Sequence, residues 1–246
     1  MRIIIVWLKF LVCYFLYYSG LLGVILRFFT SKSRGCVFVV VNYHRFVHNY
    51  DNVIEKHPSV THLISDFKRE IKFLKSYFDI VSLDTAVDKL KNQESFYRPA
   101  VCITVDDGYK DNYDLLFPVL KNENIMATIF LSTGVIGTEN MNWYDGLANT
   151  ILRAPGQSFC IKGFLNGKTF QMDSIQAKRV AYVEIVEALK EMNIYQRQRY
   201  LKNIEIDLGT CKENIRFMLN WDEVRVMKEA GISFGAHTHT HPILTK

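Results

Sequence analysis

At residues 100–108 the chain reads AVCITVDDG, an apolar run that ends in two carboxylates and a glycine. Continuous apolar runs of this length are typical of strands covered on both faces, as in parallel sheets. We predict further strands at residues 36–44, 77–83, 125–132 and 232–237. Helical patterns separate these runs, so the sequence predicts an α/β fold with a parallel sheet.

Two of the predicted helices have recognisable ends. Phe67, Ile71 and Leu74 share one helical face, and Ser65 is placed to cap the start of that helix. The later helix WDEVRVMKEAGI is expected to end at Gly231 and to lead into the last strand.

The first thirty residues differ in character from the rest of the chain. Residues 10–26 carry no charge, and about 17 to 25 apolar residues are enough to cross a bilayer. A helix that lies in the membrane interface or packs on the domain is the alternative. We predict that residues 1–34 are a hydrophobic, membrane-associated helix and a basic linker, with the side of the membrane undecided. Residues 35–246 would form one domain with a helical insertion at about residues 143–220.

Composition excludes some classes of partner and site. The net charge is +5, and no run of basic residues is interleaved with aromatic ones, so we expect no nucleic-acid partner. The five cysteines are scattered and include no CxxC pair, so neither a disulfide framework nor a thiolate zinc site is indicated.

Asp106 and Asp107 stand at the carboxyl end of a predicted strand, where parallel α/β folds build their sites. Adjacent carboxylates repel each other, so a fold that keeps both is expected to use them. One could bind a cation while the other acts as a base. A turn in which Asp107 caps the next helix is the alternative.

Three histidines alternate in FGAHTHTH, residues 234–241. If one helical turn follows the strand, His237 and His241 lie on one face and His239 points away. Two imidazoles and one carboxylate would make a hydrolytic metal centre with open positions. An exposed polar loop or an adventitious metal-binding tract is the alternative. Because both motifs end strands of one predicted sheet, we favour a centre of Asp107, His237 and His241.

These motifs resemble those of a known family. ITVDDGY is similar to the TFDDG motif, and SFGAHTHTHPIL to the H-(S/T)-x-x-H-P motif, of the polysaccharide deacetylases (the NodB homology domain, carbohydrate esterase family four). VNYHRF, FKREIKFLKSYFDIVSLDTAV and NWYDGL also resemble segments of these proteins. The resemblance covers roughly residues 35–246. It implies a distorted (β/α) barrel of the NodB type.

The resemblance also implies an activity and its residues. Asp107, His237 and His241 would hold a divalent metal, usually zinc. Asp106 would be the general base that removes a proton from the water attacking an N-acetyl group. The substrate would be an N-acetylated polysaccharide or oligosaccharide.

Other residues are implied to act less directly. Thr238 and Thr240 would orient the imidazoles. His44 is expected near the site by topology, either as part of it or as a neutral histidine bonded at the sheet end.

The sequence departs from the family pattern in two places. His239 occupies a position where the family has a small or apolar residue, and we expect it to be inert. The family pattern continues past the second histidine motif with further strands, a groove wall and a late histidine that acts as general acid. Since the sequence ends at Lys246, we expect an incomplete barrel whose C-terminal part is missing, with impaired deacetylation.

Two alternatives to a metal-dependent deacetylase remain open. One is a non-catalytic, metal-binding or membrane-tethered remnant, for which the absent general acid would argue. The other is a carbohydrate-binding module, against which Asp106 argues, because binding alone needs no base beside the metal.

Overall fold

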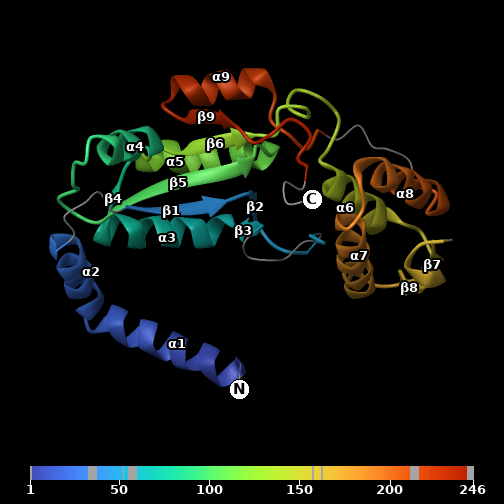
Figure 1. Ribbon diagram of the computed structural model, residues 1–246, viewed down its shortest axis with the longest axis horizontal. Helices are drawn as coiled ribbons and strands as arrows, with labels where there is room; N and C mark the ends of the chain where they lie inside the picture. The colour runs from blue at the N-terminus through green and yellow to red at the C-terminus, as the bar shows by residue number, and fades with distance from the viewer. Residues whose placement is uncertain are drawn as a thin grey trace.

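The computed structural model describes most of the chain (Figure 1). The described residues are 2–32, 38–51, 53–54, 60–156, 158–161, 163–210 and 216–242. Residues 33–34, the end of the predicted helix and basic linker, lie outside this part of the chain.

A five-stranded parallel sheet forms the centre of the described structure. Its main path runs β1-β5-β6-β9, and β4 pairs with the start of β5. The strands are β1 (Phe38–Tyr43), β4 (Asp79–Ile80), β5 (Ala100–Asp107), β6 (Thr128–Leu131) and β9 (Ser233–Ala236). All five predicted strands are therefore confirmed, and the parallel α/β class with them. Seven of the eight residues of β5 are buried, which explains its continuous apolar run.

Helices pack around this sheet. Figure 1 shows α3 running along β1 and α9 running along β9, on opposite sides of the sheet. The helices that pack around the sheet are α3 (Ile64–Tyr77), α4 (Leu83–Lys91), the π-helix η1 (Asn112–Leu116), α5 (Phe117–Glu123) and α9 (Trp221–Glu229). Their buried side chains and those of β5 and β6 form one hydrophobic cluster that includes Phe67, Ile103, Leu120, Ile129 and Met227.

The start of α3 corrects one expectation. Phe67, Ile71 and Leu74 are buried as predicted, but Ser65 does not cap the helix. The N-cap residue is Leu63, which ends β3 (Thr61–Leu63), and Ser65 lies inside the first turn with its hydroxyl bonded to Asp66. Because β3 pairs with β2 (Arg45–Val47), its last residue already fixes where the helix begins.

The later helix, α9, starts with a capping box in which the Asn220 and Glu223 side chains bond each other's backbone amides. It ends at Glu229, two residues before Gly231, whose φ of +95° turns the chain into β9. The helix thus ends two residues earlier than predicted, and a short turn through Gly231 leads into β9.

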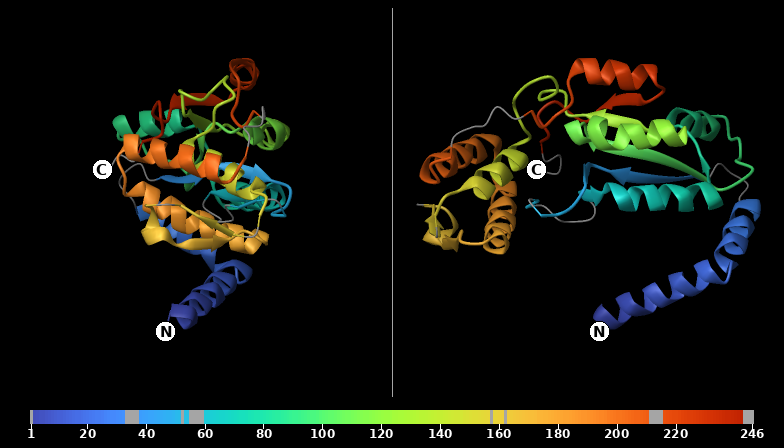
Figure 2. Two further views of the ribbon diagram at one scale, coloured as in Figure 1. Left: turned by 90° about the vertical axis from the view of Figure 1, so that its right-hand side faces the viewer. Right: turned by 180° about the vertical axis from the view of Figure 1, so that it is seen from behind.

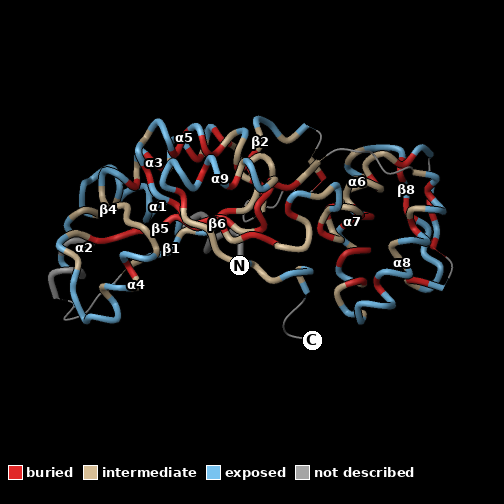
Figure 3. Tube along the Cα trace, turned by 90° about the horizontal axis from the view of Figure 1, so that it is seen from above, coloured by how far each residue is buried: buried red, intermediate tan, exposed pale blue. Residues whose placement is uncertain are grey.

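Residues 143–210 of the described chain form a separate group of helices with a small hairpin. Its elements are α6 (Trp143–Arg153), β7 (Ser158–Cys160), the 3₁₀ turn η2 (Leu165–Gly167), β8 (Thr169–Gln171), α7 (Ile175–Lys190) and α8 (Ile194–Asp207). They enclose a second hydrophobic cluster that includes Ile151, Ile185, Leu189 and Ile204. Figure 3 accordingly shows buried residues gathered in two places, along the sheet and within this insertion.

The N-terminal apolar segment is two helices, so the prediction of one hydrophobic helix within residues 1–34 is wrong. α1 (Arg2–Tyr18) and α2 (Leu21–Lys32) are separated at Gly20, whose φ is +72°. Figures 1 and 2 show α1 extending away from the sheet. Within the described residues, no helix combines the length and the apolar character that a membrane span requires. Tyr17 contacts the rings of Phe73 and Tyr77 on α3.

Candidate metal centre

Asp107 is the last residue of β5 and is almost fully buried, with 2% of its surface exposed. Its φ is +74° and that of Gly108 is +77°, so the chain leaves the strand through two consecutive left-handed residues. A Cβ at position 108 would lie 2.5 Å from Cδ2 of Leu131. The glycine of the DDG motif is therefore required both by conformation and by space.

His237 and His241 converge on Asp107. The Nε2 atoms of His241 and His237 lie 3.1 Å and 3.7 Å from Oδ1 of Asp107. One donor atom from each of the three residues lies within 4.8 Å of the others. The predicted convergence of these three side chains is thus confirmed.

The route to this convergence differs from the predicted helical turn. His237 follows β9 directly, but Thr238 and His241 have φ values of +62° and +49°. The segment is therefore an irregular loop. It still places the two imidazole rings side by side, with their centres 5.1 Å apart.

The residues between the two histidines hold this loop. Nδ1 of His239 lies 3.2 Å from the Thr133 hydroxyl, and the His239 carbonyl accepts a hydrogen bond from the Gly134 amide. His239 therefore contacts the loop after β6, as the prediction that it points away from the pair requires. The Thr238 hydroxyl accepts a hydrogen bond from the His241 backbone amide at 3.1 Å. Thr238 thus positions the backbone of His241 and does not contact an imidazole nitrogen.

Electrostatics keep the Asp107 carboxylate ionised. Burial by itself would raise the pKa of Asp107, but the hydrogen bond from His241 and the charges of His241, His44 and His237 outweigh it, so the pKa is lowered. Burial by itself would lower the pKa of His241, but the hydrogen bond with Asp107 and the charge of Asp107 outweigh burial and raise this pKa above the ordinary histidine value. The site therefore favours a positive charge beside Asp107.

This donor set fits a divalent transition metal. One carboxylate oxygen and two imidazole nitrogens are ligands that Zn²⁺ accepts, and three protein ligands leave a position for water or substrate. Partners behind the ligands are also present. The Tyr144 hydroxyl donates to Oδ2 of Asp107 at 3.1 Å, and the Ser132 hydroxyl lies 3.5 Å from Oδ1. Such partners fix the orientation of metal ligands.

Asp106 lies beside the centre with different neighbours. Its Oδ2 accepts a hydrogen bond of 2.8 Å from the Asn42 side-chain amide, and Nε2 of His44 is 3.8 Å away. Asn42 is paired in register with Thr104, whose hydroxyl donates to the side-chain oxygen Oδ1 of Asn42 at 2.8 Å. The Asp106 carboxylate is 18% exposed and the His44 side chain 25%, so both remain accessible.

A buried charged network lies behind the site. Nε of Arg45 is 3.3 Å from Oδ2 of Asp111, and its guanidinium stands 4.9 Å from the centre of the Tyr109 ring. The Tyr109 hydroxyl donates to Asp145 at 2.9 Å. Burial, assisted by the charges of Asp107 and Asp111, raises the pKa of Asp145 to about 7, against the opposing effects of Arg45 and Tyr109.

Sequence reasoning missed Asn42, Tyr144 and Asp145. Tyr144 and Asp145 belong to NWYDGL at the start of α6, a segment that resembles the family. The available signal was therefore a motif inside the predicted insertion. The structure shows that α6, in the predicted insertion, supplies a direct partner of Asp107.

Comparisons with known proteins agree with these motifs. Residues 93–246 match the family model described as polysaccharide deacetylase. The poly-beta-1,6-N-acetyl-D-glucosamine N-deacetylase of Staphylococcus aureus (strain MRSA252) is 24% identical over 210 residues, which cover 80% of this chain and 70% of that protein. The protein of the same name from Staphylococcus epidermidis is 26% identical over 184 residues, which cover 73% of this chain and 61% of that one.

Among solved structures, the Streptococcus pyogenes deacetylase PplD in complex with acetate aligns with a TM-score of 0.47 and 16% identity. The alignment covers 85% of this chain and 59% of that one. The IcaB structure from Ammonifex degensii aligns with a TM-score of 0.36 and 14% identity, covering 85% of this chain and 87% of that one. Since the family model matches well over half of the sequence, the chain belongs to the polysaccharide deacetylase family.

Proposed function

We propose that the protein is a metal-dependent hydrolase that removes acetyl groups from the N-acetylated sugars of a polysaccharide. The observation that carries this proposal is that two adjacent carboxylates have different surroundings. Asp107 is buried among two imidazoles, whereas Asp106 is accessible beside His44. The names of the Staphylococcus relatives make poly-β-1,6-N-acetyl-D-glucosamine the first substrate to test.

Asp107, His237 and His241 would hold the cation, for which Zn²⁺ is the first candidate. When bound, a cation of this kind lowers the pKa of a water molecule and polarises a carbonyl oxygen. The chain's own contribution is to keep Asp107 ionised and oriented, through the charges of the histidines and the hydrogen bond from Tyr144.

Asp106 would act as the general base. Its carboxylate is close to the cluster in sequence, is accessible, and is not one of the three clustered donors. The Asn42 amide holds Oδ2 from the β1 side, so the carboxylate has a fixed orientation. It would accept the proton that the attacking water loses as the new bond to the acetyl carbon forms.

His44 would donate a proton to the amine that leaves as the second product. Breaking the carbon–nitrogen bond releases an amine, which leaves readily only when its nitrogen is protonated. The His44 imidazole lies 3.8 Å from Asp106 and is accessible, so it can face the same bound group. The reaction would consume one water and yield acetate and a free amino sugar.

Acetate release from β-1,6-linked N-acetylglucosamine oligomers, with added Zn²⁺, tests this function. Asp106→Asn should lower kcat by about 10² to 10⁴-fold, the usual contribution of a general acid or base. Asp173→Asn is the matched control, because Asp173 is an exposed aspartate on the insertion. A chelator should abolish the activity and Zn²⁺ should restore it. Turnover by Asp106→Asn equal to that of the control would refute the assignment.

We also propose that α1 and α2 attach the protein to a membrane by lying in its interface. Large apolar side chains are exposed along both helices: Leu11, Phe15, Tyr18, Val24 and Phe28 are each more than half exposed. Apolar surface exposed along a helix suits insertion at the headgroup level.

Sedimentation with phosphatidylcholine–phosphatidylglycerol vesicles tests the attachment. The double variant Leu11→Asp/Phe15→Asp should lose binding, because carboxylates disfavour the interface. Val180→Asp/Val183→Asp is the control with the same charge change, at exposed positions on α7. Equal sedimentation of both variants, or none of the unmodified protein, would contradict the proposal.

A further inference from the structure

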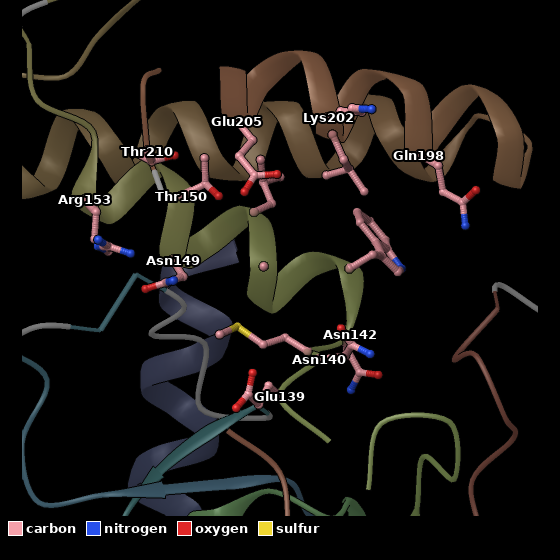
Figure 4. Close-up of a pocket in the computed structure, with 15 residues that line it drawn as sticks. Glu139, Asn140, Asn142, Asn149, Thr150, Arg153, Gln198, Lys202, Glu205 and Thr210 are labelled. Carbon is pink, nitrogen blue, oxygen red and sulfur yellow. The ribbon is translucent and has the colours of Figure 1, made fainter. Parts of the chain in front are cut away.

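A cavity of about 510 Å³ lies between α6 and α8 in the insertion. This volume is within the range of small-molecule sites, about 300 to 1,000 Å³. Figure 4 shows Asn149 and Thr150 on α6, and Gln198 and Lys202 on α8, flanking the same space. None of these residues belongs to the metal centre.

The cavity adjoins the metal centre through the start of α6. Asn142 and Trp143 line the cavity, and the next residue, Tyr144, belongs to the site. The Asn142 amide donates to the Tyr144 hydroxyl at 3.0 Å, and that hydroxyl donates to Asp107. The Tyr144 ring also stands 5.2 Å from that of His241. Asn142 and Tyr144 therefore link the cavity lining directly to a metal-centre residue.

The charged lining of the cavity suits a neutral ligand. Glu139 and Glu205 are balanced by Arg153 and Lys202, so the four charges sum to zero. This balance gives an anionic ligand such as a phosphate no net electrostatic attraction.

The uncharged lining suits a sugar. Side-chain amides such as Asn149 and Gln198 offer both donors and acceptors, as sugar hydroxyls and N-acetyl groups require. Trp143 adds an aromatic surface, and the Arg197 guanidinium stands 4.7 Å from the centre of its ring. The aromatic surface can pack against the C–H face of a sugar ring.

Gly146 supplies an independent observation. It lies in the interior of α6, where glycine costs about 1 kcal/mol relative to alanine. Its φ is not left-handed, and a Cβ built there would meet no atom within 4 Å beyond its chain neighbours and its own helix backbone. Neither backbone conformation nor packing therefore requires glycine at this position. Because Gly146 lines the cavity, the open space above it is what the glycine preserves.

We propose that this cavity is a binding subsite for the sugar units that neighbour the one being deacetylated. The subsite rests on the proposed deacetylase function, and it makes the insertion the part of the protein that recognises chain length. A substrate of several units would fill both the centre and the cavity, whereas a single N-acetylated sugar would reach the centre alone.

Gly146→Leu tests the subsite, because the leucine side chain would project from α6 into the cavity. We expect the kcat/KM ratio of a β-1,6-linked N-acetylglucosamine tetramer to the monomer to fall by about tenfold or more, mainly through KM, as loss of uniform binding predicts. Gln198→Ala should lower the same ratio in the same direction. Gln196→Ala is its matched control, an exposed glutamine on α8 that does not line the cavity. Thermal unfolding would show whether each variant is folded.

Calorimetric binding of the tetramer to Asp106→Asn, with and without Gly146→Leu, separates the subsite from the activity. Weaker binding in the double variant supports the subsite, even where the unmodified protein shows no turnover. Turnover by the unmodified protein, with equal tetramer affinity and equal ratios in all variants, overturns the subsite and leaves the deacetylase function standing. Absence of both turnover and binding in the unmodified protein overturns both proposals. If Gly146→Leu does not fold, Gln198→Ala against Gln196→Ala decides the outcome.

Discussion

The Tyr144 hydroxyl donates a hydrogen bond to Oδ2 of Asp107, while Oδ1 faces the two histidines and the Ser132 hydroxyl. Burial, with the charges of Asp145 and Asp107, raises the pKa of the Tyr144 hydroxyl, so it remains a donor at neutral pH. The two oxygens of one carboxylate therefore have different partners. Since Tyr144 comes from α6, the orientation of the Asp107 carboxylate depends on the insertion.

Tyr144→Phe should weaken Zn²⁺ binding by about 10 to 100-fold, because loss of a ligand's outer partner typically costs this much affinity. Competition with a chromophoric chelator would measure the dissociation constant. Tyr200→Phe is the control, since it removes another tyrosine hydrogen bond of the insertion, from its hydroxyl to the Gly163 carbonyl at 3.0 Å. Equal affinities in the two variants would show that Tyr144 does not position Asp107.

Asn42→Asp should shift the pH dependence of deacetylation. The change replaces the amide that donates to Asp106 by a second carboxylate, and a neighbouring like charge raises the pKa of a carboxyl group. The general base would then be protonated at higher pH, so the acidic limb of kcat/KM should move upward. Asn42→Ala removes the same hydrogen bond without adding charge, and should lower kcat with a smaller shift. An unmoved acidic limb in Asn42→Asp would argue against Asp106 as the base.

Much of the fold could be predicted because its central strands, β5 and β6, are buried on both faces. β5 and β6 carry runs of apolar residues that only a covered sheet explains. The convergence of Asp107, His237 and His241 could also be predicted, because parallel strands present their carboxyl ends at one edge. The irregular loop between the histidines could not be predicted, because Thr238 adopts a left-handed φ at a position where the sequence has no glycine to indicate it.

Other errors have similar physical causes. Hydrophobicity alone predicted one helix at the N-terminus, whereas the left-handed φ of Gly20 divides it. Ser65 was expected to cap α3, but strand pairing at Leu63 sets the helix start. Asn42 and Tyr144 were not identified because their contacts depend on the register of β1 with β5 and on where the insertion packs.

Asp145→Asn should flatten the pH dependence of stability in the metal-free protein. Burial raises the pKa of Asp145 from its ordinary value of 3.8 to about 7, so the folded state binds one more proton than the unfolded state between these values. The free energy of unfolding should therefore fall as the pH rises through this window, and the contribution is lost above it. Asparagine keeps an oxygen that can accept the Tyr109 hydrogen bond but does not titrate.

Urea unfolding at pH 5, 6, 7 and 8, after removal of metal by a chelator, measures this effect. The stability of Asp145→Asn relative to the unmodified protein should increase from pH 5 to pH 8. Asp173→Asn should show no such trend, because Asp173 is exposed. Parallel stability curves for all three proteins would contradict the raised pKa.

Gly108→Ala and Gly146→Ala should change stability in opposite directions. At position 108 the left-handed φ costs a residue with a side chain about 1 to 2 kcal/mol. The added Cβ would also lie 2.5 Å from Leu131 and 3.1 Å from Ile136, and overpacking of this kind costs about 1 to 3 kcal/mol. At position 146 the helix is regular and the space is open, so alanine should stabilise by up to about 1 kcal/mol. Urea unfolding of the two variants measures both changes. Titration with Zn²⁺ should show weaker binding only for Gly108→Ala, because residue 108 directly follows Asp107, one of the three proposed metal ligands. A stable Gly108→Ala with unchanged Zn²⁺ affinity would mean that the chain can leave β5 by another path.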